Sequence, residues 1–193
     1  MLYSELQCSD AIHKAVERMG FAEMTEIQEK TIPVMMAGYD VIAKAPTGTG
    51  KTCAFGIPVA EHILPENKYP QAVIMAPTRE LAQQIAQELE ELTYFMPEVQ
   101  VACVYGGANM EKQARRLAEG CQIVVATPGR LMDHYKHHSI DLAHVTQVVL
   151  DEADEMLNMG FYKDVRHIIE LMKARKSLSM FSATISREVM DIG

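Results

Sequence analysis

A glycine-rich segment in the first third of the chain has the residue types that bind phosphate. Residues 45–52 read Ala-Pro-Thr-Gly-Thr-Gly-Lys-Thr and lie between an apolar run and a pattern of helical period. Gly48 and Gly50 allow backbone angles that turn successive amides inward, which forms a nest for phosphate oxygens at a helix N-terminus. Lys51 adds a point charge for the β and γ phosphates, and the hydroxyl of Thr52 can join the ligand shell of Mg²⁺. The segment predicts a nucleotide phosphate site; the alternative is a glycine-rich turn that only caps a helix.

A second group of reactive side chains is acidic and directly follows another apolar run. Residues 148–150 (Val-Val-Leu) lead into residues 151–154 (Asp-Glu-Ala-Asp). A buried strand there delivers two carboxylates to its end, Asp151 to hold Mg²⁺ and Glu152 to orient and deprotonate an attacking water. The alternative is an acidic helix start that interacts favourably with the helix macrodipole. The phosphate segment upstream favours the first interpretation, because hydrolysis of a nucleotide needs both parts.

These groups need a frame that brings distant segments together, and the chain alternates strand-like and helical patterns. The apolar runs are Val41–Ala45, Ala72–Ala76, Val99–Tyr105, Gln122–Thr127, Gln147–Leu150 and Leu178–Ser182. Between them lie stretches of helical period, for example Glu80–Tyr94. Strands this apolar, alternating with helices, imply a parallel sheet with helices on both faces, a three-layer α/β sandwich. We expect one domain over residues 1–193, with loops at Pro65–Pro70 and near residues 137–141.

The polar motifs of the chain fall where these runs end. In chain order they are residues 45–52, Pro77-Thr78-Arg79-Glu80, Gly106-Gly107, Thr127-Pro128-Gly129-Arg130, Asp151-Glu152-Ala153-Asp154 and Ser182-Ala183-Thr184. Ligands of open parallel sheets bind at the carboxyl ends of the strands, so all six motifs are predicted to meet at one edge.

Composition limits the classes of protein that fit. The chain has 18 Lys plus Arg against 26 Asp plus Glu, a net charge of −8, whereas a protein held to nucleic acid by bulk charge is basic. Nucleic acid would therefore bind in a local groove of backbone amides and a few arginines. The four cysteines show no metal-ligand spacing, and no apolar run reaches the roughly 18 residues of a membrane span, so we expect a cytoplasmic protein. His134, His137 and His138 have metal-like spacing, but we expect them beyond a helix and exposed.

The motifs in this order resemble those of the DEAD-box ATP-dependent RNA helicases of superfamily two, of bacterial type. Residues 45–52, 151–154 and 182–184 are similar to the phosphate loop, the Asp-Glu-Ala-Asp box and the Ser-Ala-Thr motif of that family. Residues 20–28 (Gly-Phe-x-x-x-Thr-x-Ile-Gln) resemble its adenine-reading Q motif, which places a Q-motif region at about residues 1–30. Residues 77–82, 106–107 and 127–130 resemble motif Ia, the Gly-Gly motif and motif Ib.

The chain departs from the family pattern in four places and one larger respect. Met24 replaces the usual proline, Pro46 and Thr49 stand in a loop that commonly reads Ala-Gln-Thr-Gly-Ser-Gly, and Tyr3 takes the place of an upstream phenylalanine. The family's second RecA-like domain, with its arginine fingers, has no counterpart in these residues. The resemblance therefore implies the first RecA-like lobe of an enzyme and a nearly inactive isolated fragment.

The resemblance implies ATP and Mg²⁺ as cofactors and assigns residues to them. Nucleotide contacts fall to Phe21, Thr25, Gln28, Thr47, Gly48, Thr49, Gly50, Lys51 and Thr52, Mg²⁺ to Thr52 and Asp151, and catalysis to Lys51, Asp151, Glu152, Ser182 and Thr184. The Gln28 amide can accept from adenine N6 and donate to N7, which favours ATP over GTP. Phe21 either packs on the adenine ring or is a core aromatic. Ser182 and Thr184 either pair with Asp154 or are ordinary turn hydroxyls.

The resemblance also implies an RNA surface that reads no base sequence. Its residues are Pro77, Thr78, Arg79, Gly106, Gly107, Thr127, Pro128, Gly129 and Arg130. Glycine lets backbone approach backbone, and arginine and exposed amides suit phosphates. Thr78 and Thr127 could contact sugar or phosphate, or could cap helices.

With its second lobe, such a protein would hold ATP and RNA between the lobes, part short duplexes and release RNA after hydrolysis. Two other interpretations are a nucleotide-gated binding module and a DNA helicase of the same superfamily. Glu152, which only hydrolysis requires, disfavours the binding module. The Q motif together with the Asp-Glu-Ala-Asp box disfavours the DNA helicase.

Overall fold

The computed structural model describes residues 1–46 and 50–192 and forms a six-stranded sheet. The predictions for Thr47, Gly48 and Thr49 lie outside the described residues. The strands are β1 (Ile42–Lys44), β2 (Ala72–Met75), β3 (Val101–Val104), β4 (Ile123–Ala126), β5 (Gln147–Asp151) and β6 (Ser177–Ser182). Every neighbouring pair is parallel, in the order β1-β6-β5-β2-β4-β3. The predicted parallel sheet is confirmed, with one strand in each predicted run.

The strands are shorter than some of the predicted runs because flanking residues turn out of the ladder. The amide of Val99, for example, bonds to the carbonyl of Met96 at 3.0 Å instead of joining β3. The helices are η1 (Tyr3–Glu5), α1 (Asp10–Arg18), α2 (Glu26–Met36), α3 (Lys51–Glu61), α4 (Arg79–Leu92), α5 (Met110–Ala118), α6 (Pro128–Lys136), α7 (Ala153–Asn158), α8 (Tyr162–Leu171) and α9 (Arg187–Ile192). Helix α4 confirms the helical pattern predicted for Glu80–Tyr94. In residues 1–46 and 50–192, no helix combines the length and apolar character needed to cross a bilayer.

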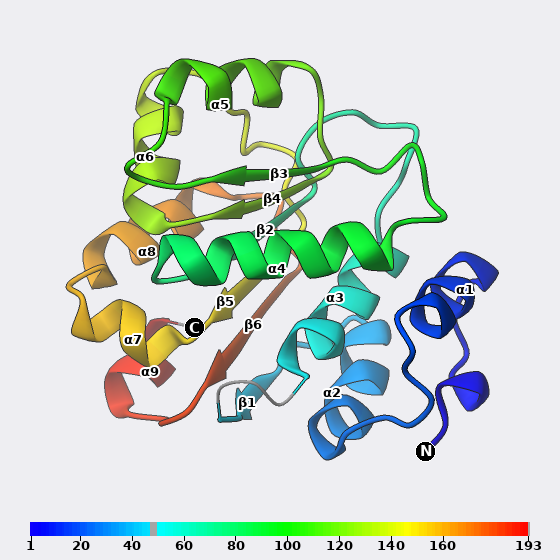
Figure 1. Ribbon diagram of the computed structural model, residues 1–193. Coiled ribbons are helices and arrows are strands. Elements are labelled where there is room, and N and C mark those ends of the chain that lie inside the picture. Colours follow the sequence, from blue (N-terminus) through cyan, green and yellow to red (C-terminus); the bar gives the residue numbers. More distant parts are fainter. Residues whose placement is uncertain (47–49, 193) are drawn as a thin grey trace.

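Helices cover both faces of the sheet, as Figure 1 shows for α4 in front of the strands. Successive strand residues point to opposite faces, and in the central strands both sets are apolar. In β5, Val149 packs into the cluster formed with α1, α2, α3 and α4, whereas Val148 and Leu150 pack into the cluster formed with α5, α6, α7, α8 and α9. Burial on two faces explains why the strand sequences do not alternate between apolar and polar residues.

The loop between α3 and β2 is held at the amino edge of the sheet by buried glutamines. Gln71 accepts from the amide of Leu64 at 2.8 Å and donates to its carbonyl at 2.9 Å. Gln122 donates to the carbonyl of Pro65 at 3.0 Å. These bonds satisfy backbone groups that the loop would otherwise leave unpaired. The predicted loop at Pro65–Pro70 is confirmed, and residues 137–141 also connect two elements.

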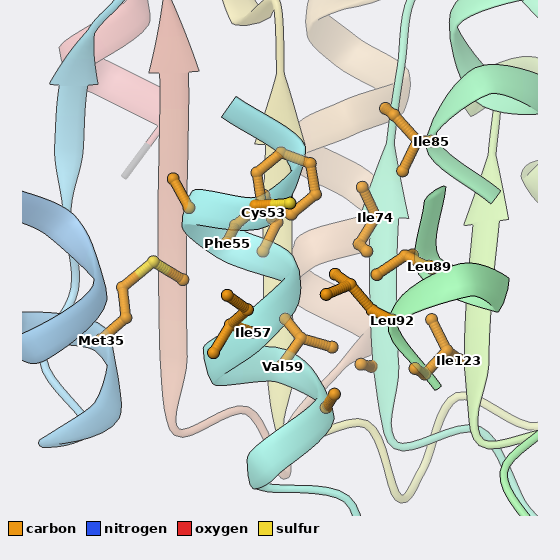
Figure 2. Close-up of a cluster of buried hydrophobic side chains, with 14 of the residues drawn as sticks. Met35, Cys53, Phe55, Ile57, Val59, Ile74, Ile85, Leu89, Leu92 and Ile123 are labelled. Carbon is orange, nitrogen blue, oxygen red and sulfur yellow. The ribbon is translucent and has the colours of Figure 1, made fainter. Parts of the chain in front are cut away.

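Helix α3 is buried along its length, and this packing fixes the position of Lys51, the residue that begins the helix. Figure 2 shows Phe55, Ile57 and Val59 of α3 packed among the sheet, α2 and α4. Phe55 also contacts Phe181 of β6, with ring centroids 5.3 Å apart. A Cβ added to Gly56 would lie 2.8 Å from Leu92 Cδ1, so glycine sets how closely α3 and α4 approach.

The close approach of α3 and α4 predicts a graded cost of enlarging Gly56. Gly56→Val should lower the free energy of unfolding by about 1–3 kcal/mol, because the branched side chain forces the two helices apart. Gly56→Ala is the matched control and should cost less, since its methyl group meets only the ends of the Leu89 and Leu92 side chains. Denaturant unfolding of both variants checks this. A valine variant as stable as the alanine variant would contradict this account of the helix packing.

Candidate active site

The strand order divides the carboxyl edge of the sheet into two halves. Strands β1, β6 and β5 are neighbours, and they end at Lys44, Ser182 and Asp151. The phosphate loop, the Ser-Ala-Thr motif and the acidic motif therefore lie side by side. Strands β2, β4 and β3 make up the other half. They are followed by the three motifs that resemble the family's RNA-contacting motifs, namely residues 77–82, 127–130 and 106–107. The described residues of all six motifs lie at one edge, as predicted.

A buried ion pair forms the centre of the first half. Lys51 begins α3, and its Nζ lies 3.0 Å from Oδ1 of Asp151 and 3.9 Å from Oε1 of Glu152. The Lys51 and Asp151 side chains are 6% and 1% exposed. Burial raises the pKa of Asp151, and the charge of Lys51 opposes that shift. Two segments that are distant in sequence thus place a cation and two carboxylates within reach of one phosphate group.

The second oxygen of Asp151 has an unusual environment. Oδ2 is buried and has no hydrogen-bond partner among the described residues. The hydroxyl-bearing Thr52, at the start of α3, is also buried. A buried carboxylate oxygen without a donor is costly unless a ligand satisfies it. An oxygen ligand set of this kind suits a hard cation, so the residues present fit Mg²⁺.

Glu152 is held in a backbone conformation that few residues other than glycine adopt. Its φ and ψ are 53° and 52°, in the left-handed region, and its amide donates to Oδ1 of Asp151 at 3.0 Å. Such conformations carry strain and are retained where the surroundings enforce them. Glu152 lines a cavity of 250 Å³ together with Lys51, Asp154 and Ala183. The strained turn therefore places a carboxylate on a cavity that a small molecule such as water can enter.

Asp154 connects the acidic motif to the end of β6. Its Oδ2 accepts from the amide of Thr184 at 3.1 Å and from the Thr184 hydroxyl at 2.9 Å. Its own amide donates to Oγ of Ser182 at 3.1 Å, and that hydroxyl donates to the carbonyl of Thr184 at 2.7 Å. The predicted pairing of Ser182 and Thr184 with Asp154 is confirmed. These hydrogen bonds to the carboxylate lower the pKa of Asp154 against the effect of burial.

The Q-motif segment packs directly against the phosphate loop. Thr25 and Gln28 form a capping box at the start of α2, which fixes the loop as expected for Thr25. Gln28 is 4% exposed, and its Nε2 donates to the carbonyl of Gly50 at 3.1 Å. A Cβ on Gly50 would lie 2.6 Å from that nitrogen, and the φ of Gly50 is +75°, so both conformation and space require glycine.

A cavity of 640 Å³ opens beside these residues. It is lined by Tyr3, Phe21, Gln28 and Gly50 from one side and by α4 from the other. Phe21 is 45% exposed and belongs to neither apolar cluster, so the interpretation of Phe21 as a core aromatic is wrong. Its contact with adenine stays a prediction.

The α4 wall of this cavity contains Glu88, a residue that the sequence motifs do not single out. It lies in the third turn of α4, outside the apolar face of that helix, so the sequence alone indicates an ordinary charged side chain in solvent. In the structure Glu88 is half-buried and shares a hydrogen bond with Thr52. Burial raises the pKa of Glu88, and the bond with Thr52 opposes the shift. A carboxylate therefore stands behind the hydroxyl expected to bind Mg²⁺.

The second half of the edge has exposed glycines with an exposed arginine beside them. Arg79 lies over the Tyr105 ring, with its Cζ 4.9 Å from the centroid, and its Nη1 would lie 3.6 Å from a Cβ on Gly107. Gly106 and Gly107 are exposed. Thr78 caps α4 by accepting from the amide of Leu81 at 3.2 Å, which confirms its structural role.

The first turn of α6 carries the remaining candidate RNA residues. Pro128 occupies its first position, and Thr127 precedes it as the N-cap residue. Thr127 makes no side-chain capping bond within the described part of the chain, so of the two interpretations the capping one is wrong. Gly129 follows at an intermediate level of exposure. This leaves the start of α6 without a cap from Thr127 at the ligand edge.

The Arg130 side chain points into the protein, whereas its predicted contact with RNA phosphate needs an exposed guanidinium. The side chain is 14% exposed, and its Nη1 donates to the carbonyl of Ala108 at 2.9 Å and to Oε1 of Gln113 at 3.1 Å. The expectation that His134 lies beyond this helix and exposed is wrong, because it lies within α6 and is fully buried. Its Nε2 lies 3.0 Å from the same Gln113 oxygen, one turn of helix after Arg130. The two side chains hold α5 and the Gly-Gly loop against α6.

Comparison with known proteins identifies the family. The profile of the family described as DEAD/DEAH box helicase matches residues 25–192. A protein of Limosilactobacillus reuteri named ATP-dependent RNA helicase CshA is 49% identical over 193 residues, 100% of this chain and 39% of that protein. A Bacillus subtilis protein named DEAD-box ATP-dependent RNA helicase CshA is 44% identical, covering 98% of this chain and 38% of that protein. The chain thus spans less than two fifths of the length of these relatives.

Solved structures share the fold. The crystal structure of a DEAD box protein from the hyperthermophile Methanococcus jannaschii has a TM-score of 0.92 at 41% identity and covers 100% of this chain and 52% of that one. A hypothetical ATP-dependent RNA helicase from Sulfolobus tokodaii has a TM-score of 0.88 at 40% identity, with 95% and 53% covered. The six-stranded parallel sheet is the fold of a RecA-like DEAD-box domain, and this chain belongs to the DEAD/DEAH box helicase family.

Proposed function

We propose that this chain is the ATP-binding lobe of an ATP-dependent RNA helicase. In a longer protein, with a second lobe, it couples hydrolysis of ATP to the separation of short RNA duplexes. The observation that carries the proposal is the convergence of Lys51, Asp151 and Glu152 at one site. The printed names of the relatives support ATP and RNA as its ligands.

In the proposed complex, the phosphates of ATP replace Asp151 as the ion-pair partner of Lys51. In the described arrangement Lys51 is paired with Asp151, and a bound γ phosphate competes for the same Nζ. Asp151 Oδ2 and the Thr52 hydroxyl would hold Mg²⁺, which would supply positive charge beside the phosphates. The contacts of Thr47, Gly48 and Thr49 with the phosphate oxygens stay a prediction from the sequence, and Gly50 precedes Lys51 at the start of α3.

Glu152 acts on the attacking water. Its strained turn fixes the carboxylate beside Lys51, on the cavity that Asp154 also lines. A carboxylate at this position can orient a water molecule and accept its proton as the bond to phosphorus forms. Mere binding of nucleotide does not need this group.

Asp154, Ser182 and Thr184 transmit the state of the nucleotide site. Asp154 lies three residues after the Mg²⁺ ligand Asp151, and its hydrogen bonds extend to the end of β6. Movement of the acidic motif on ATP binding therefore moves the Ser-Ala-Thr segment. That coupling, and not a contact with phosphate, is the role we assign to the two hydroxyls.

RNA lies along the ends of β2, β4 and β3. Exposed Arg79 and the Gly106–Gly107 backbone meet phosphates, and the amides at the start of α6 add donors. Pro77 turns the chain between β2 and this surface. Arg130 acts mainly by holding the Gly-Gly loop in place. None of these contacts reads a base, so binding depends on backbone shape.

The role of Glu152 predicts a variant that binds but does not turn over. In a two-lobe protein, Glu152→Gln keeps the shape of the side chain and removes the base, so hydrolysis should fall by roughly 10²-fold or more while ATP still binds. Glu170→Gln is the matched control, because Glu170 is exposed on α8 and does not line the 250 Å³ cavity. Steady-state hydrolysis with RNA, and nucleotide titration, measure the two effects. Normal turnover in the Glu152→Gln protein would mean that another group is the base. Equal stimulation by DNA and RNA would favour the DNA helicase.

Substitution of the two arginines of the proposed RNA surface should have different effects, one on RNA affinity and the other on stability. Arg79→Ala should weaken binding of single-stranded RNA by roughly tenfold and leave the unfolding midpoint unchanged, because it removes one charge-assisted phosphate contact. Arg130→Ala should cost about 1–3 kcal/mol of stability, because Gln113 and the Ala108 carbonyl lose a buried donor. Fluorescence anisotropy and thermal unfolding test both. A stable Arg130→Ala protein with weakened RNA binding would return Arg130 to the set of phosphate contacts.

The lobe alone should not hydrolyse ATP in response to RNA. An arginine finger on the transferring phosphate is worth roughly 10³–10⁵ in rate, and the two arginines of the sequence motifs, Arg79 and Arg130, follow β2 and β4, away from the phosphate loop. Residues 1–193 should therefore bind nucleotide weakly, bind RNA more weakly still, and show no RNA-stimulated turnover. Covalent addition of the second lobe should restore it. RNA-dependent hydrolysis by these residues alone, abolished in Lys51→Ala, would show that the second lobe is not needed.

A further inference from the structure

Tyr105 connects the parts of the proposed RNA surface, although it belongs to none of the sequence motifs. It directly follows β3 and precedes the Gly106–Gly107 pair, and its side chain is half-buried. The ring contacts α4, which begins after β2, and β4 separates these two strands in the sheet. One aromatic side chain therefore bridges two loops that a whole strand holds apart.

Two side chains of α4 contact Tyr105. The guanidinium of Arg79 lies over the ring, with its Cζ 4.9 Å from the centroid. One turn further along the helix, Nε2 of Gln83 donates to the Tyr105 hydroxyl at 3.0 Å. A Cβ on Gly107 would lie 3.6 Å from Nη1 of Arg79, so the stacked guanidinium lies directly beside the Gly-Gly loop.

The backbone of Tyr105 is bound to the third part of the surface. Nε2 of Gln113 donates to the Tyr105 carbonyl at 3.0 Å, and Oε1 of Gln113 accepts from Nη1 of Arg130 at 3.1 Å. Gln113 is buried, so these bonds are shielded from water. Tyr105 is thus fixed at both ends, by Gln113 at its backbone and by Gln83 at its hydroxyl. The ring is a fixed support against which a flexible side chain can lie.

The stacked arrangement leaves the hydrogen-bond donors of Arg79 available to a ligand. A guanidinium has five N–H groups in its own plane, and a ring below that plane uses none of them. Within residues 1–46 and 50–192, the Arg79 guanidinium makes no ion pair and no hydrogen bond. A carboxylate partner, in contrast, would occupy some of these donors and offset the charge. An unrestrained arginine also loses rotamer freedom when it binds, and stacking reduces that loss.

We propose that Tyr105 is a positioning residue for RNA binding, which holds the Arg79 guanidinium beside the Gly-Gly loop with its donors free for an RNA phosphate. The inference rests on the proposed RNA surface and adds to it a residue that acts through Arg79. The ring face toward α4 is covered by the guanidinium, so no base can stack on that face. Tyr105 therefore contributes to affinity by ordering Arg79 and not by touching RNA.

The first test measures the affinity of residues 1–193 for fluorescein-labelled oligouridylate by anisotropy at low salt, where phosphate contacts contribute most. Tyr105→Leu should weaken binding by roughly two- to fivefold, the value of an exposed cation–π contact, and Tyr105→Phe, which keeps the ring, should bind nearly as well as the unmutated chain. Tyr94→Leu is the matched control. Arg18 lies 3.8 Å over the Tyr94 ring, just beyond the other end of α4, so the same kind of pair is lost away from the RNA surface. Its RNA affinity should be unchanged.

A double-mutant cycle separates positioning from direct contact. In an Arg79→Ala background, Tyr105→Leu should have no further effect on RNA affinity. An equal loss in both backgrounds would overturn the inference, because Tyr105 would then touch RNA itself. Full affinity in Tyr105→Leu, or a Tyr105→Phe protein as weak as Tyr105→Leu, would overturn it as well. Thermal unfolding of each variant shows whether an affinity change is a loss of fold.

A second variant does not depend on the stability of Tyr105→Leu. Arg79→Lys keeps the charge but has no planar group to lie on the ring, so it should bind RNA less well than the unmutated chain. Full affinity in Arg79→Lys would overturn the inference and leave the proposed RNA surface intact. If the unmutated chain binds no RNA, or if Arg79→Ala binds it equally well, the proposed surface and the inference fail together.

Discussion

The ion pair between Lys51 and Asp151 is the constraint on which the rest of the site depends. The two residues are one hundred positions apart, and they meet because β1 and β5 flank β6 and end at the same edge. Loss of either partner from a buried pair leaves an uncompensated charge, at a cost of about 3–5 kcal/mol. The two charges therefore compensate each other within the protein. In the proposed site, ATP and Mg²⁺ would replace the pair only together, the phosphates satisfying Lys51 and the cation satisfying Asp151, so that proposal implies cooperative binding of nucleotide and metal.

The strand order joins the proposed nucleotide half to the proposed RNA half at one pair of strands. Strand β5, which ends in Asp151, is paired with β2, which leads to Pro77, and Met75 lies opposite Leu150 in the register. Both strands are buried on both faces, and close-packed interiors transmit strain, so a displacement at the end of β5 can reach β2. The hydrogen bonds of Asp154 with Ser182 and Thr184 form a second connection, between the ends of β5 and β6.

The sequence was sufficient to predict the sheet and the edge at which the motifs gather, because both follow from the order of apolar runs and polar motifs along the chain. Apolar runs predict strands, and the residue types after them predict what gathers at the carboxyl edge. The contacts between side chains of different elements could not be predicted. His134 has the pattern of an exposed histidine, but Gln113 of α5 gives it a buried partner. Arg130 is drawn inward by the same glutamine, and Glu88 gains its role only from the packing of α4 on α3.

If the proposed function is correct, charge requires this lobe to hold RNA by geometry. The chain carries −8, and at the proposed RNA half the Nη1 of Arg130 is directed inward to Ala108 and Gln113, whereas Arg79 is exposed. Few phosphates can therefore be neutralised by side chains, and the counterion release that drives most nucleic-acid binding is small. Backbone amides at helix starts and around Gly107 supply donors without net charge. Such donors act only when the phosphates follow the spacing of the loops, so on the proposed function the lobe selects a backbone shape and the proposed second lobe supplies further affinity.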